Sequence, residues 1–229
     1  MSGGGSVALG SSVTLTNAGV TSVAAGTGIS VSGSTGGVTI TNTATSAYVG
    51  DRGQVFTANG TFTIPTGVTA LKVTVQGGGA NGGGANNGVA SGGSAGATAI
   101  AYLTGLTSGN TLSVTVGGVA GNSSVASGTQ SITTITANGN GGSASGGTIN
   151  IQGGSGNGGF NASVGCSNNG FGGSGANSLF GAGGPITGNF SNGNPATGYG
   201  SGGGGAAAIG SSTSQSGGAG KQGVVIFEW

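Results

Sequence analysis

Few side chains in this sequence could do chemistry. Its 229 residues contain no histidine and one cysteine, and the charged residues are limited to Asp51, Arg52, Lys72, Lys221 and Glu228. Acid–base catalysis and metal binding both need several titratable or ligating side chains held close together. The sequence therefore predicts no catalytic residue, no metal site and no cofactor, and it argues against an enzyme.

Two motifs that could carry chemistry are poor matches. Residues 217–222 are similar to a Walker phosphate loop, but Gln215 stands where the motif needs glycine and Gln222 where it needs serine or threonine. Cys166 has no histidine, lysine or arginine near it in the sequence to activate its thiol, so we expect an inert side chain. A net charge of +1 without a basic cluster argues against nucleic acid as a partner.

The remaining side chains are uncharged and of types that can bind a ligand. Aromatic residues recur every nine to eleven residues, among many asparagines, within the glycine-rich stretch 153–205. Rings cover the C–H faces of sugars or apolar parts of protein loops, and amides fix the orientation of a ligand. The candidate receptor-binding residues are Phe160, Asn168, Asn169, Phe171, Phe180, Phe190, Asn194 and Tyr199. Alternatively, the same rings form a small core that holds the stretch together.

The framework for these residues is predicted to be all-β. Apolar residues alternate with threonine, lysine and glutamine at residues 61–64 and 71–76, which is typical of strands with one buried face. Asn59-Gly60 between two such runs predicts a hairpin turn over residues 58–60. Further strands are expected at residues 98–103, 111–116, 130–136, 148–151 and 223–229. Together they predict an antiparallel β-sandwich, jelly-roll-like, over residues 51–229.

Glycine supplies 61 residues and is concentrated between the predicted strands. Collagen is excluded because there are only three prolines and because residues 202–205 break a triplet repeat. Glycine-rich insertions are expected at residues 77–96, 117–128, 138–147 and 153–205. One interpretation is packed polyglycine-II helices, whose main-chain groups pair between neighbouring segments and whose turns carry the aromatic residues. The alternative is a long flexible loop.

Residues 1–50 form a separate segment of short strand repeats. Residues 12–17 recur nearly unchanged as residues 37–42, with a similar run at residues 28–32. These runs hold too few apolar groups to offset the entropy of ordering a chain, about 1–2 kcal/mol per residue. We therefore expect residues 1–50 to attach to another protein or to trimerise, in preference to being a flexible tail.

Three segments resemble a known family. Residues 55–79 resemble the opening of the glycine-rich domain of bacteriophage tail-fibre and receptor-binding proteins, and residues 220–229 resemble the closing strand of that domain. Residues 23–33 are similar to repeats in phage fibre shafts. The resemblance implies a virion protein, a fibre or spike adhesin for host attachment. Such a protein is made in the host cytoplasm and carries packed polyglycine helices with exposed loops at their tip.

The resemblance also implies partners. These are two further copies in a homotrimer, other virion proteins bound through residues 1–50, and a host surface glycan or outer-membrane protein as the receptor. Two other functions stay open. A capsid decoration or head-fibre protein would have a purely structural role on the capsid surface. An ice-binding protein built from polyglycine helices would present neutral threonine, alanine and asparagine faces.

Overall fold

The computed structural model describes residues 22–34, 37–42, 52–164 and 167–229, and the chain divides into two compact units, Met1–Gly50 and Asp51–Trp229. In the first unit, β1 (Ile29–Val31) pairs antiparallel with β2 (Ile40–Asn42). Ile29 and Ile40 are both exposed. This strand pair therefore presents apolar side chains that a core would otherwise cover. The earlier repeat, residues 12–17, lies outside the described residues.

The second unit contains a β-sandwich. The strands of the sandwich are β3 (Gly53–Phe56), β4 (Gly60–Thr63), β5 (Ala70–Gln76), β6 (Thr98–Thr104), β7 (Thr111–Thr115), β8 (Ser123–Ser127), β9 (Ile135–Ala137), β10 (Ala144–Ser145), β11 (Ile149–Ile151) and β14 (Val224–Glu228), while β12 (Phe160–Val164) and β13 (Ser167–Phe171) form a separate two-stranded sheet. One sheet has the order β11-β6-β5-β14-β3 and the other β10-β9-β8-β7-β4, with antiparallel pairing throughout. The all-β prediction is confirmed. The structure shares two facing antiparallel sheets with a jelly roll. Its strand order differs, because β7 to β10 are connected as a meander and a jelly roll has Greek-key connections.

Apolar side chains from both sheets fill the space between them. The ring of Phe62 from β4 stacks on that of Phe227 from β14, with centroids 4.0 Å apart. Phe56 and Trp229 pack against this pair. Val73 of β5 lies in the same core and is fully buried. The alternation in the sequence therefore identifies the buried faces of β4 and β5 correctly.

The sequence prediction is wrong at the turn over residues 58–60. This turn does not close a hairpin, because β3 pairs with β14 in one sheet while β4 pairs with β7 in the other. The Asn59 side chain instead accepts a hydrogen bond from the Val116 N–H at 2.8 Å, which holds the crossing between the sheets. A turn signal reports local backbone preference, and it does not tell which sheet the next strand will join.

Two segments expected as glycine-rich insertions contribute strands to the sandwich, and a third, residues 153–205, contains the hairpin of β12 and β13. Residues 117–128 include β8 and residues 138–147 include β10, while the strand expected at residues 130–136 is reduced to β9. Serine and alanine have little intrinsic strand preference, but they pair in a ladder when a neighbouring strand supplies the partner. Tertiary context therefore overrides local composition in this part of the sheet.

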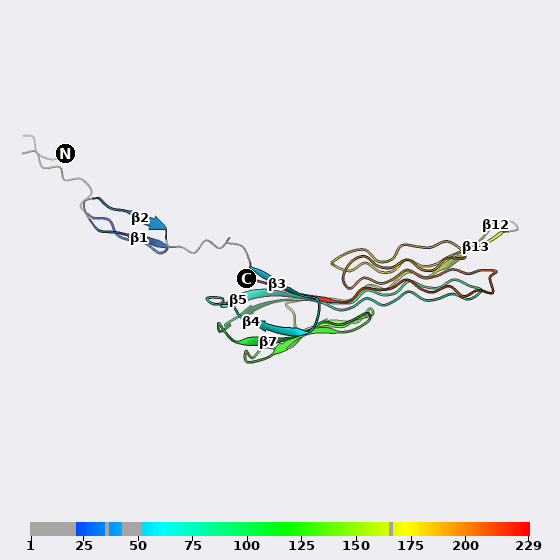
Figure 1. The fold of residues 1–229 in the computed structure, drawn as a ribbon, viewed down its shortest axis with the longest axis horizontal. Coiled ribbons are helices and arrows are strands. Elements are labelled where there is room, and N and C mark those ends of the chain that lie inside the picture. Colours follow the sequence, from blue (N-terminus) through cyan, green and yellow to red (C-terminus); the bar gives the residue numbers. More distant parts are fainter. Residues whose placement is uncertain (1–21, 35–36, 43–51, 165–166) are drawn as a thin grey trace, which may run out of the picture. The chain divides into compact units, whose positions relative to one another are not determined.

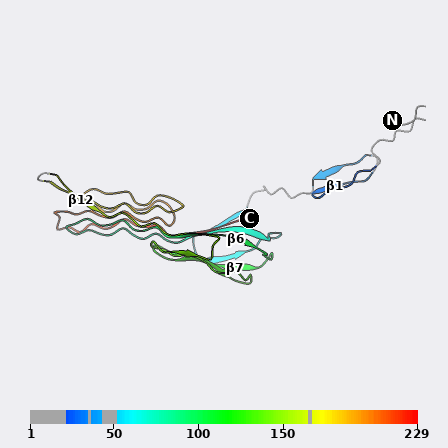
Figure 2. The ribbon, with the colours of Figure 1, turned by 180° about the vertical axis from the view of Figure 1, so that it is seen from behind.

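Glycine-rich segments extend from one end of the sandwich and lie side by side in a bundle (Figures 1 and 2). Its extended segments, which we call struts, are residues 77–85, 90–97, 153–159, 172–178, 181–187, 191–198, 201–208 and 215–223. The first two struts continue β5 and precede β6, and the last leads into β14. The bundle is thus built onto the three middle strands of one sheet.

Hydrogen bonds between struts repeat every third residue. Strut 77–85 donates to strut 90–97 and to strut 215–223 from alternate sides. The donor–acceptor pairs are Gly77–Ala97, Ala80–Ser94 and Gly83–Ser91 for the former, and Gly79–Lys221, Gly82–Gly218 and Ala85–Gln215 for the latter. A period of three residues is that of the polyproline-II helix, which forms no hydrogen bonds within itself. This pattern matches packed polyglycine-II helices and not a flexible loop.

Strut 201–208 is the central strut of the bundle, and all of its residues are buried. Its N–H groups donate in rotation to struts 172–178, 77–85 and 191–198. The pairs are Gly202–Ala176, Gly203–Ala80, Gly204–Asn194, Gly205–Gly173, Ala206–Gly83 and Ala207–Ser191. Its carbonyl groups accept from the remaining neighbours, struts 90–97, 181–187 and 215–223. Because neighbouring struts surround it, a Cβ atom on Gly203 would collide with the carbonyl oxygen of Gly218.

Asparagine side chains link struts where the main chain alone does not. Oδ1 of Asn81 accepts from the Gly220 N–H at 2.9 Å. In the same way, Oδ1 of Asn177 accepts from Gly183 at 2.8 Å, and Oδ1 of Asn192 accepts from Ser216 at 2.8 Å. A backbone N–H that is left unpaired in a packed structure costs free energy. These amides therefore stabilise the bundle from its sides.

Gln76 connects the bundle to the sandwich. Its side chain is fully buried at the end of β5. Nε2 donates to the carbonyl oxygens of Gly77, Gly96 and Ala97 at 3.1, 2.9 and 3.1 Å, and Oε1 accepts from the Thr98 hydroxyl at 2.6 Å. One amide thus pairs the carbonyl groups at the point where two strands of the sheet become struts.

The sandwich carries a surface ion pair between Lys72 and Glu228, with Nζ and Oε2 2.8 Å apart. The hydrogen bond to Glu228 raises the pKa of Lys72 above its ordinary value, against a smaller opposing effect of burial. Because the pKa is higher in the folded state, the ion pair stabilises the fold fully at pH values below the unfolded-state pKa of about 10.4. This stabilisation is lost as the pH rises through the folded-state pKa. Because both side chains are exposed, the pair contributes at most about 1 kcal/mol.

Candidate contact site at the tip of the bundle

The end of the bundle far from the sandwich is formed by four connections, which we call the distal tip. They are residues 86–89, the hairpin of β12 and β13, residues 189–190 and residues 209–214. Both views place the hairpin at this end (Figures 1 and 2). The Gly210 N–H donates to Oδ1 of Asn87 at 2.9 Å, and the Ala208 N–H donates to the Gly88 carbonyl at 2.8 Å. These bonds join separate connections into one surface.

The hairpin carries a pair of stacked rings. Phe160 and Phe171 face each other across the ladder of β12 and β13, with ring centroids 5.0 Å apart. Phe160 is 51% exposed. Gly170 sits beneath them, and a Cβ atom there would lie 2.8 Å from the side chain of Val89 and 2.9 Å from that of Ile209. The base of the hairpin is therefore packed tightly onto the tip, and the Phe160 ring is held at its surface.

Phe190 is the second exposed ring of the distal tip, with 59% of its surface accessible. Its backbone φ is +59°, a conformation that bulky residues rarely adopt. Asn189 supports the turn, because its Oδ1 accepts from the N–H of Phe190 at 3.1 Å and from that of Ile209 at 2.7 Å. A strained turn that holds a large apolar side chain in solvent is a feature of contact sites.

A polar pocket of about 450 Å³ lies on the same tip and is lined by Asn86, Asn87, Gly210, Ser211 and Ser212. The positive φ of Asn87, +48°, is one that asparagine tolerates. The pocket walls carry amides and hydroxyls but no charge. Together with the exposed rings, this arrangement can hold a neutral ligand by hydrogen bonds and by packing against its apolar faces.

Coulomb attraction plays little part at this tip, because no charged residue occurs from residue 73 to residue 220. Among the residues that the structure describes, no group of three or more His, Cys, Asp and Glu could hold a metal ion. The described residues also contain no helix that could span a lipid bilayer. The candidate site is thus a neutral surface formed by rings, amides and hydroxyls.

The structure brings some of the predicted binding residues together and separates others. Phe160, Asn168, Asn169, Phe171 and Phe190 belong to the distal tip. Phe180 and Tyr199 instead lie in turns at the opposite end of the bundle, beside the sandwich. The expectation that aromatic residues mark the turns between struts holds at residues 180, 190 and 199, whereas Phe160 and Phe171 form a ladder pair.

Two other residues from the sequence analysis lie elsewhere. Asn194 lies within a strut, and its Nδ2 donates to the carbonyl oxygens of Pro185 and Ile186 at 3.3 and 3.2 Å, so its amide already serves the bundle. Cys166 lies outside the described residues, and its expected inertness stays a prediction.

Sequence reasoning missed the residues that line the polar pocket. Asn86-Asn87-Gly88 is a turn signal between two glycine-rich runs, and it could have marked the end of a strut. Residues 209–214 interrupt the glycine and alanine run in the same way. Pairing these two connections across the bundle required the fold, because more than a hundred residues separate them in the chain.

A comparison with known proteins identifies no relative from which a function could be inferred. No protein-family model matches this sequence, and no curated protein matches it. The tip and the bundle that carries it are therefore the features from which a function has to be argued.

Proposed function

We propose that this chain is a non-enzymatic structural protein of a bacteriophage virion, a fibre or spike, whose distal tip contacts the host cell surface. The observation that carries the proposal is the contrast between the bundle and its tip. Along the struts, most residues are small and main-chain groups pair with those of neighbouring struts, with Ile186 as an exposed large apolar side chain. At the tip, Phe160 and Phe190 are more than half exposed beside a pocket of amides and hydroxyls.

The receptor that suits this tip is a neutral one. Exposed aromatic residues are favoured at contact sites because they bury a large area with little loss of conformational entropy. The uncharged pocket adds hydrogen bonds that fix orientation. A host surface glycan or the external loops of an outer-membrane protein offer both kinds of partner group. We place receptor binding at the distal tip on this basis.

In this proposal, residues 1–50 attach the chain to the virion. The exposed Ile29 and Ile40 of the first unit would be covered by two further copies of the chain in a homotrimer, or by another virion protein. A capsid decoration protein with a purely structural role would use the same attachment without a receptor. The two functions differ in where the chain sits on the particle.

Immunogold labelling of purified phage particles with an antibody against the full chain tests the virion assignment. We expect label at the tail or its fibres, together with slower adsorption of antibody-treated particles to host cells. Label confined to the capsid, with normal adsorption, would favour the decoration protein and contradict receptor binding. Particles that lack the chain altogether would contradict both functions.

A further inference from the structure

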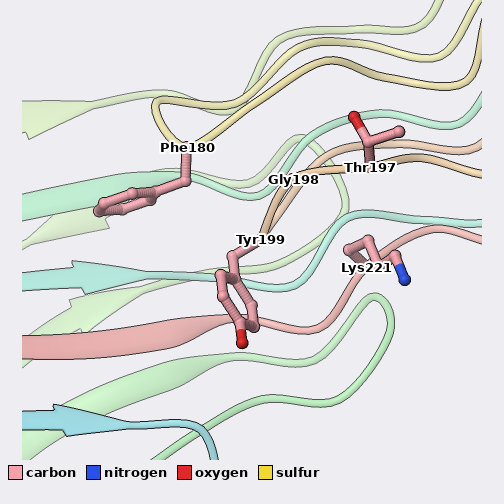
Figure 3. Close-up of a pocket in the computed structure, with 5 residues that line it drawn as sticks. All are labelled: Phe180, Thr197, Gly198, Tyr199 and Lys221. Carbon is pink, nitrogen blue, oxygen red and sulfur yellow. The ribbon is translucent and has the colours of Figure 1, made fainter.

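A second group of aromatic side chains lies at the opposite end of the bundle. Phe180, Thr197, Gly198, Tyr199 and Lys221 line a pocket of about 340 Å³, which we call the collar pocket (Figure 3). They come from two turns between struts, from the end of strut 191–198 and from strut 215–223, which leads into β14. The volume falls within the range of about 300–1,000 Å³ that is usual for small-molecule sites.

The backbone fixes the two turns that carry the rings. The hydroxyl of Ser178 donates to the Tyr199 carbonyl at 2.6 Å, and the hydroxyl of Ser201 donates to the Gly181 carbonyl at 2.8 Å. Gly181 and Gly198 approach so closely that a Cβ atom on Gly181 would lie 2.6 Å from Cα of Gly198. The main chain that carries both rings is therefore ordered before a ligand arrives, which lowers the entropy lost on binding.

Lys221 gives the collar pocket a charge that the rest of the bundle lacks. It is the next charged residue after Lys72 in the sequence, and Lys72 is paired with Glu228 on the sandwich. The Lys221 N–H donates to the Ser201 carbonyl at 3.0 Å, which anchors its main chain, while its side chain is exposed. In Figure 3, Lys221 and Phe180 lie on opposite sides of Gly198, and the Tyr199 ring lies below them in this view.

We propose that the collar pocket binds an anionic saccharide. The C–H face of the sugar ring would pack on Tyr199 or Phe180, and its carboxylate or phosphate would pair with the Lys221 ammonium. An apolar ligand would form no ion pair with Lys221, and an inorganic anion would not pack against the aromatic rings. A sugar with one negative group uses both, and the hydroxyls of Thr197 and Tyr199 offer hydrogen bonds to its ring.

The proposal is tested by titrating the full-length protein with sodium glucuronate, glucose 6-phosphate and glucose at low ionic strength, followed by saturation-transfer NMR. We expect an anionic sugar to bind about fivefold more tightly than glucose, which is the factor expected from one exposed ion pair. Comparing the first two sugars distinguishes a carboxylate ligand from a phosphate ligand. Raising the salt concentration should reduce the preference, because exposed charges are screened.

Variants separate the roles of the charge and the rings. Lys221→Gln should abolish the preference for anionic sugars, and Tyr199→Ala should weaken the binding of all three. The matched control Lys72→Gln, at the other exposed lysine, should leave the titrations unchanged. An anionic preference that survives Lys221→Gln, or no binding of any of the sugars at about 10 mM, would overturn the proposal. Neither result bears on receptor binding by the distal tip.

Discussion

The Gly203→Ala variant is expected to unfold about 10 °C below the wild type and to lose slow amide hydrogen exchange throughout the bundle. The added methyl group would collide with the Gly218 carbonyl oxygen, and Gly218 cannot move freely because it bonds to Gly204 and Gly82. Overpacking of this kind costs about 3 kcal/mol or more, and each kcal/mol lowers the melting temperature of a chain of this size by about 2–4 °C.

The control for this variant is Gly188→Ala. A Cβ atom on Gly188 would have no neighbour within 4 Å, and its φ lies outside the range that disfavours alanine. We expect an unchanged or slightly higher melting temperature, because alanine restricts the unfolded chain more than glycine does. If the two variants melt together, the struts are not packed backbone against backbone as described.

The Gln76→Leu variant is expected to lower the free energy of unfolding by about 3 kcal/mol or more. Leucine is similar in size to glutamine but pairs with none of the groups around it, so the Gly96 carbonyl oxygen and the Thr98 hydroxyl lose their partner, while the Ala97 carbonyl keeps the hydrogen bond from the Gly77 N–H. Each buried polar group that is left unpaired costs about 1–3 kcal/mol. Equilibrium unfolding in urea measures the difference directly.

Gln222→Leu provides a matched comparison, since it makes the same chemical change at a partly exposed position. Its Nε2 donates one hydrogen bond, to the Thr57 carbonyl at 2.9 Å, where water can replace it. A loss of at most about 1 kcal/mol is expected there. Equal losses in the two variants would mean that Gln76 does not hold the junction between sandwich and bundle.

The framework strands could be predicted from the sequence because their apolar residues alternate. Leu71, Val73 and Val75 point to the core, as the pattern indicates. The same alternation assigns Gln76 to the exposed face, yet it is fully buried. The reason is that the struts cover the end of β5 on the side that would otherwise face solvent, and no local pattern reports such coverage.

The order of the struts could not be predicted from the sequence. Neighbouring struts recognise each other through main-chain N–H and C=O groups, which every residue carries, so glycine leaves no side-chain code for partner choice. Asn81 and Gly220 pair across 139 residues of chain. Asparagines that link struts and asparagines that face solvent look alike in sequence, which is why Asn194 resembled a binding residue and the pocket residue Asn87 was missed.

Binding of the labelled full-length protein to host cells tests most directly the claim that the bundle presents a contact tip. The Phe160→Ser/Phe190→Ser double variant should bind at least about tenfold more weakly than the wild type, because central aromatic contacts each contribute about 1–2 kcal/mol or more. Tyr102→Ser, which removes a ring that is 58% exposed on the sandwich, should bind like the wild type. Undiminished binding by the double variant, with its slow hydrogen exchange intact, would contradict the account.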